Sequence, residues 1–131
     1  MTYATRKDLE TRFGADEIAK LADDETVLAA AIADAAAEID SRLAVAYALP
    51  LDGAFPALVP IAADLARRRL YDEAAPEHVT TAASEARERL GEIADGTAAL
   101  VDSRGDPAPR ANAGTTTPGR QTFATGRLAG F

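Results

Sequence analysis

Apolar residues recur at helical spacing along three stretches of this chain. In residues 28–46, 58–66 and 79–93 they lie three or four positions apart, so each set shares one narrow stripe of a helix. The stripes consist of Leu28, Ile32, Ala35, Ile39, Leu43 and Ala46; of Leu58, Ile61, Ala62, Leu65 and Ala66; and of Val79, Ala83, Ala86, Leu90 and Ile93. This pattern predicts an all-α fold, a small bundle of long amphipathic helices organised around the stretch in residues 28–51. The last stripe has heptad-like spacing, which suits packing against a helix of the same chain or of a neighbouring subunit.

Local signals set the expected helix ends. The predicted helices cover residues 4–14, 16–21, 25–47, 56–72 and 76–95, and we expect no sheet within residues 1–96. Thr5 and Asp8 are spaced as in a capping box, and Asp24 suits the N-cap of the central helix. Pro50 should end that helix near Tyr47, because proline disfavours the helical conformation of the residue before it.

The composition of the sequence changes at Asp102. Residues 102–131 are rich in Gly, Pro, Thr and Ala without periodicity, and such a segment cannot bury enough apolar surface to order itself. We therefore predict a helical domain in residues 1–101 and an extended C-terminal docking tail in residues 102–131, with the stretch to Thr117 supplying reach. The residues expected to contact a partner are Arg120, Phe123, Arg127, Leu128 and Phe131. The alternative is a solvated terminus with no partner.

Charge is unevenly distributed between these two parts. Residues 1–101 carry 10 Lys/Arg and 19 Asp/Glu, a net charge of −9, whereas residues 102–131 carry 4 Arg and 2 Asp, a net charge of +2. An acidic body disfavours phosphate-dominated binding of nucleic acid. A basic tail is suited to an acidic partner surface.

The arginine triplet at residues 67–69 is the most conspicuous charge cluster. Successive helical residues point about 100° apart, so the three side chains do not form one basic patch. Arg67 and Arg68 should be solvated, whereas Arg69 falls on the apolar stripe and needs a partner. We predict a structural ion pair with Asp40 inside the subunit; the functional alternative is a phosphate or DNA contact. On the surface of the central helix, Glu38 precedes Arg42 by the four residues that favour an ion pair.

Candidate chemistry is sparse. The chain has no cysteine, which excludes disulfides, thiolate metal sites and a cysteine nucleophile. The single histidine, His78, has no nucleophile or metal-ligand residue at the spacing of a catalytic or metal-binding motif, and the carboxylates are scattered along the sequence. We therefore expect no enzyme activity, no cofactor and no metal. No apolar run approaches membrane-spanning length and no signal peptide opens the chain, so we expect no membrane partner.

Several short stretches, taken in order, resemble the Mu-like prophage family of small helical proteins. They are Met1-Thr2-Tyr3-Ala4-Thr5 with Asp8-Leu9 and Arg12-Phe13-Gly14, then Ile39-Asp40-Ser41-Arg42-Leu43, Tyr47-Ala48-Leu49-Pro50-Leu51, Ile61-Ala62-Ala63-Asp64-Leu65-Ala66-Arg67 and Leu70-Tyr71-Asp72. Each stretch alone is unspecific, but their order and spacing together are specific. The resemblance covers about residues 1–96 and excludes the tail.

This resemblance implies a head–tail connector, or adaptor, of tailed phages and of gene transfer agents, which are phage-like particles. Such subunits form a homo-oligomeric ring beneath the portal, twelve-fold like the portal itself, and contact a connector or stopper protein on the tail side. The implied fold is a helical bundle whose long helices line a channel, with a C-terminal extension that reaches the portal protein. DNA passes through the channel without sequence-specific binding. The protein would be made in the bacterial cytoplasm and reside in the neck of the virion or phage-like particle.

Two other classes remain open from the residues. One is a small helical binding or regulatory protein whose C-terminal tail folds on a target. The other is an enzyme of unrecognised type, which would require converging carboxylates of perturbed pKa in a deep pocket.

Overall fold

The helices of the chain follow the apolar stripes of its sequence. A computed structural model describes residues 2–71 and 73–111, and within them the chain forms α1 (Arg6–Phe13), α2 (Ala15–Leu21), α3 (Glu25–Leu43), α4 (Leu58–Leu70) and α5 (Glu77–Asp95). The described residues contain no strand longer than an isolated bridge. The prediction of an all-α bundle is therefore confirmed.

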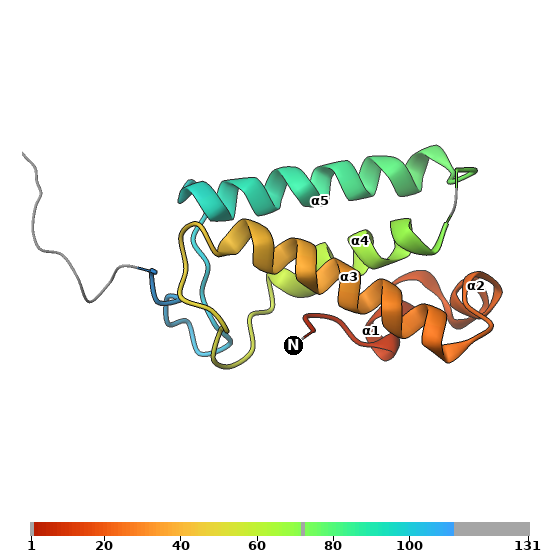
Figure 1. Cartoon of the computed structure of the whole chain (residues 1–131), viewed down its shortest axis with the longest axis horizontal. Helices are drawn as coiled ribbons and strands as arrows, with labels where there is room; N and C mark the ends of the chain where they lie inside the picture. The colour runs from red at the N-terminus through yellow and green to blue at the C-terminus, as the bar shows by residue number, and fades with distance from the viewer. Residues whose placement is uncertain (1, 72, 112–131) are drawn as a thin grey trace, which may run out of the picture.

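Helix α4 is the centre of the bundle, because it packs against both α3 and α5. Figure 1 shows α5 along one long edge of the molecule, with the short helices α1 and α2 beside the beginning of α3. The chain reaches residue 111 at the opposite end, near the ends of α3 and α5. The apolar stripe of α5 therefore packs against helices of its own chain and not against a neighbouring subunit.

The core includes every residue of the predicted stripes except Ala46, which is partly buried. Bulky members such as Leu28, Ile39, Leu65 and Leu90 are at most 1% exposed, and alanines between them let the helix axes approach closely. Burial of this apolar surface is the main favourable term in folding, at roughly 25 cal/mol per Å².

The predicted helix starts are confirmed in detail at two caps. The Thr5 side chain accepts a hydrogen bond from the backbone of Asp8, whose carboxylate accepts in turn from the backbone of Thr5. The carboxylate of Asp24 accepts from the backbone N–H of Thr26 and so caps α3. Gly14 separates α1 from α2 at φ +96°, a conformation that favours glycine.

The central helix ends earlier than the sequence predicted. Helix α3 stops at Leu43, and the next residues form a turn in which the Tyr47 N–H donates to the Leu43 carbonyl at 2.8 Å. The backbone of Tyr47 then pairs with Arg110 in an antiparallel bridge. Pro50 therefore lies beyond the end of the helix rather than setting it, because pairing with the distant C-terminal segment turns the chain away first.

Residues 97–111, which we call the closing segment, pack against the end of the bundle. Leu100 and Ala108 are buried, and the Ala108 N–H donates to the Leu100 carbonyl at 2.9 Å. The packed part of the chain therefore continues past the boundary predicted at Asp102. Backbone and side-chain hydrogen bonds hold residues 102–111 although this stretch lacks apolar periodicity, and the domain boundary at Asp102 stays a prediction.

Candidate assembly surface

The five predicted docking residues lie outside the part of the chain that the structure describes. They are Arg120, Phe123, Arg127, Leu128 and Phe131, and the described residues end at Ala111. Their role as partner contacts stays a prediction. What the structure does define is the place from which the C-terminal residues depart.

That departure point is fixed by backbone hydrogen bonds to the end of α3. The Ala111 N–H donates to the Ala46 carbonyl at 3.0 Å, and the Ala48 N–H donates to the Pro109 carbonyl at 3.0 Å. The guanidinium of Arg110 lies over the ring of Tyr47, 4.8 Å from its centroid. These contacts fix Ala111 at the end of the bundle where α3 and α5 finish (Figure 1).

A carboxylate organises the turn that precedes this departure point. The buried Asp102 side chain accepts hydrogen bonds from the backbone N–H groups of Arg104 and Asp106, both at 2.9 Å, and from the Arg104 guanidinium at 3.0 Å. The bond from Asp106, followed by the one from the Arg104 side chain, lowers the pKa of Asp102 below its ordinary value. These bonds give an acceptor to two backbone N–H groups of the closing segment, which belongs to no helix or sheet.

Arg69 does not pair with Asp40, so that prediction is wrong. The Arg69 side chain is 38% exposed and donates to Glu38 at 3.1 Å, while Asp40 accepts a hydrogen bond from the Tyr3 hydroxyl. Glu38 and Asp40 lie about 200° apart around α3, so they face opposite flanks of the helix. Arg69 lies in the last turn of α4, where its long side chain reaches the solvent edge instead of the core.

Glu38 joins three helices at that edge. Its carboxylate accepts from Arg87 of α5 at 2.6 Å and from Arg69 of α4 at 3.1 Å, so these two arginines replace the predicted partner Arg42. The bond from Arg87 is the largest cause that lowers the pKa of Glu38, and the bond from Arg69 adds to it.

Replacing Glu38 with Gln should lower the free energy of unfolding by about 1 kcal/mol at neutral pH, because two partly exposed ion pairs are lost. The pKa of Glu38 is lower in the folded chain than in the unfolded chain. Its contribution is therefore present above about pH 4.3 and disappears as pH falls through the folded-state pKa. Urea unfolding from neutral to acidic pH should give a smaller difference between Glu38→Gln and the unaltered chain at low pH. Glu85→Gln, on the exposed face of α5, is the matched control, and an equal loss there would contradict the prediction.

Arg67, which we predicted to be solvated, is more enclosed than Arg69. Its side chain is 12% exposed, forms two bonds to Glu17 at 2.7 and 3.0 Å, and lies over the Phe13 ring, 4.1 Å from the centroid. Tyr71 also donates to Glu17, at 3.2 Å. These contacts attach α1 and α2 to α4, and the Arg67 bond is the largest cause that lowers the pKa of Glu17.

Arg67→Ala should therefore destabilise the fold by about 2 kcal/mol, since it removes a charge-assisted bidentate pair and an arginine–aromatic contact. Arg69→Ala should cost less than about 1 kcal/mol, as expected for an exposed pair. Chemical unfolding of the two variants side by side measures the difference. Equal losses, or a larger loss for Arg69→Ala, would show that the enclosure of Arg67 contributes nothing.

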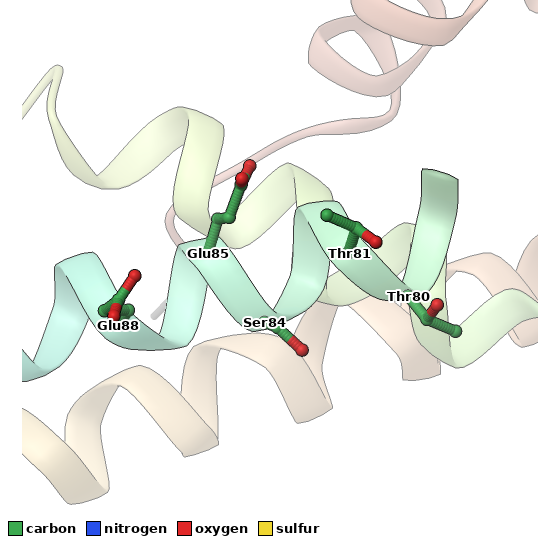
Figure 2. Close-up of a pocket in the computed structure, with 5 residues that line it drawn as sticks. All are labelled: Thr80, Thr81, Ser84, Glu85 and Glu88. Atoms are coloured by element: carbon green, nitrogen blue, oxygen red, sulfur yellow. The ribbon is translucent and has the colours of Figure 1, made fainter. Parts of the chain in front are cut away.

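The outer face of α5 is acidic and exposed. It carries Glu77, Glu85, Glu88, Glu92 and Asp95, whereas Arg87 and Arg89 lie on the flanks of the helix. Figure 2 shows part of this face, a hollow lined by Thr80, Thr81, Ser84, Glu85 and Glu88. All five side chains come from successive turns of α5, so the hollow has no opposing wall that would enclose a small molecule.

A groove lies between the end of α3 and the last turns of α5. It is lined by Arg42, Val45, Glu88, Gly91, Glu92, Ala94 and Asp95. A Cβ added at Gly91 would lie only 2.8 Å from the Arg42 guanidinium, so glycine lets this side chain lie across the helix. A glycine inside a helix costs roughly 1 kcal/mol relative to alanine, and this close approach accounts for its use. Val45 at the edge of the groove is 79% exposed.

Within the described residues, no group of histidines and carboxylates is arranged to hold a metal ion. His78 is exposed, with its ring Nε2 3.5 Å from the Arg67 guanidinium. A search of the helices in this part of the chain found none long and apolar enough to cross a bilayer. The ion pairs described above connect helices to one another, whereas the acidic face of α5 and the groove beside it are exposed.

A comparison with known families identifies a match. The model of the family described as bacteriophage Mu, Gp36 matches residues 3–117. The match confirms the resemblance to a Mu-like phage family and extends it past residue 96 through the closing segment. It ends before all five predicted docking residues. No curated protein matches the chain.

Proposed function

This chain belongs to the bacteriophage Mu Gp36 family, and from that premise we propose that it is a head–tail connector subunit. In this proposal, copies of the chain form a ring in the neck of a phage or phage-like particle, between the portal protein and a tail-side connector or stopper. The observation that carries the proposal is the family match over residues 3–117, together with the order of motifs that resembles connector proteins.

The charge of the fold supports a position around DNA. The outer face of α5 presents five carboxylates, and residues 1–101 carry a net charge of −9. Such a surface repels phosphate, so duplex DNA would slide past it without binding. We therefore assign α5 to the channel side of the ring, because the carboxylates of its exposed surface outnumber its two exposed arginines, Arg87 and Arg89.

The departure point of the C-terminal residues supports contact with a second protein at one end of the bundle. Hydrogen bonds from Ala48 and Ala111 hold the closing segment against the end of α3, so the residues after Ala111 start from a fixed position. In a ring, every copy would present this end in the same direction, toward the portal. Weak binding by each copy would then be multiplied by the number of copies.

Electron microscopy of the full chain purified together with the portal protein of its own particle tests the proposal. We expect an additional ring of density coaxial with the portal, absent from images of the portal alone. Native mass spectrometry of the same sample should give many copies of the chain per portal. A chain that stays monomeric or dimeric in the presence of the portal would overturn the connector assignment and favour a small binding protein whose tail folds on another target.

A further inference from the structure

The groove between α3 and α5 is electrostatically unbalanced. Glu88, Glu92 and Asp95 line it opposite a single cation, Arg42. Of the helices in the described residues, α5 alone has no basic residue of its own in its last turn, where the partial negative charge of a helix collects, and the cation placed beside its C-cap Gly96 is the Arg110 guanidinium. A cationic ligand would therefore be favoured here, and the exposed Val45 provides an apolar contact beside it.

We propose that this groove is the docking site for residues 112–131 of the same chain. These residues contain Arg120 and Arg127 but no Asp or Glu, and they carry the bulky apolar side chains of Phe123, Leu128 and Phe131. Their charge is opposite to that of the groove. An arginine adjacent to an apolar residue, as in Arg127-Leu128, matches a surface where carboxylates adjoin a valine.

The path of the chain brings this segment to the groove. The Ala111 N–H donates to the carbonyl of Ala46, the residue next to Val45, so the segment begins at the edge of the groove. Arg120 lies nine positions after Ala111, and an extended chain spans at most about 3.3–3.6 Å per position, or roughly 30 Å. The groove extends over only two turns of α5, about 10 Å, so the segment can reach all of it with slack.

Attachment to the same chain makes weak docking effective. A short flexible connection holds the segment at an effective concentration on the order of 1 mM, so a dissociation constant near 0.1 mM would keep the groove about nine-tenths occupied. The docked segment would be withheld from other surfaces until a partner with higher avidity displaced it. This docking does not depend on the connector role, since it concerns one copy of the chain alone.

Thiol labelling of the full chain tests the docking directly. The chain has no cysteine, so Val45→Cys introduces a single thiol that is small and weakly polar. We would compare its rate of alkylation by iodoacetamide in two backgrounds. One keeps the natural C-terminal residues, and the other carries Arg120→Glu, Phe123→Ser, Arg127→Glu, Leu128→Ser and Phe131→Ser. Alkylation should be about tenfold slower with the natural residues, the ratio set by the occupancy above.

Ala29→Cys supplies the matched control, because Ala29 is an exposed residue near the beginning of α3. It lies sixteen positions before Val45, or about 24 Å at the 1.5 Å rise of a helix. Its alkylation rate should be the same in both backgrounds, and unfolding curves should show that all four chains are folded before denaturant is added. Equal alkylation rates for the Val45→Cys thiol in the two backgrounds would overturn the proposal. Protection that disappears on dilution would also overturn it, since that result places the segment in the groove of another copy.

Discussion

A chain that ends at Thr117 should fold as the full chain does, yet fail to join portal-containing heads to tails. The packed structure already includes the closing segment up to Ala111, so removal of residues 118–131 takes away no described core contact. Docking of these residues in the groove at about nine-tenths occupancy would stabilise the folded chain by RT ln(1 + 10), about 1.4 kcal/mol, so truncation should lower the free energy of unfolding by no more than about that amount. The deleted residues include every predicted docking residue, and with them the apolar and arginine contacts assigned to the portal.

Mixing purified heads, tails and either chain, and then counting joined particles by electron microscopy, measures this effect. Joining with the truncated chain should fall to the level seen with no added chain. A full-length chain carrying Thr115→Ser, Thr116→Ser and Thr117→Ser is the control, because it keeps the docking residues and changes only the stretch before them. Normal joining by the truncated chain would leave the C-terminal residues without a portal role, even if labelling shows that they dock in the groove.

The helices could be predicted because their apolar stripes are long and their caps are local. The stripe residues of α3, α4 and α5 need only the 3.6-residue period to be recognised, and the Thr5–Asp8 capping box lies within four residues. Fold class follows from such signals alone. Such signals do not indicate which side of each helix will pack against a neighbouring helix.

The two arginine predictions failed for that reason. A helical wheel places Arg69 on the apolar stripe of α4 and Arg67 off it, but the wheel contains no information about neighbouring helices. The short helices α1 and α2 cover the side of α4 that carries Arg67, and they provide Phe13 and Glu17 as its contacts. Arg69 lies near the end of α4, where the edge is open and Glu38 is within reach.

The closing segment could not be predicted because its contacts are not periodic. Asp102 holds its turn by bonds to residues two and four positions ahead, and the bridge at Tyr47 joins residues 63 positions apart. Its composition is typical of unstructured chain, so only the three-dimensional pairing reveals that it is packed. The groove was hidden for the same reason, since Arg42 and Val45 meet α5 only after both helices are placed.

Tyr47→Ala should cost about 3–5 kcal/mol of folding free energy, the range for removing a large buried aromatic side chain. Tyr47 is 4% exposed at the junction of α3, α5 and the closing segment. Its hydroxyl donates to the Ile93 carbonyl at 3.1 Å, and its ring supports the Arg110 guanidinium. The substitution should therefore loosen the closing segment and also lower the stability of the bundle.

Tyr47→Phe separates the hydroxyl from the ring. It removes one buried hydrogen bond but leaves the Ile93 carbonyl bonded to the Gly96 N–H at 3.3 Å, so its cost should be only about 1 kcal/mol. Chemical unfolding gives both values, and amide hydrogen exchange at Ala48 and Ala111 reports whether the closing segment stays in place, since these N–H groups form its bonds to the turn after α3. In Tyr47→Ala these amides should exchange faster than those in the middle of α4, because the ring that orders them is gone while the α4 core remains. Unchanged exchange at Ala48 and Ala111 in Tyr47→Ala would mean that backbone bonds alone hold the departure point, and that Tyr47 stabilises only the helices.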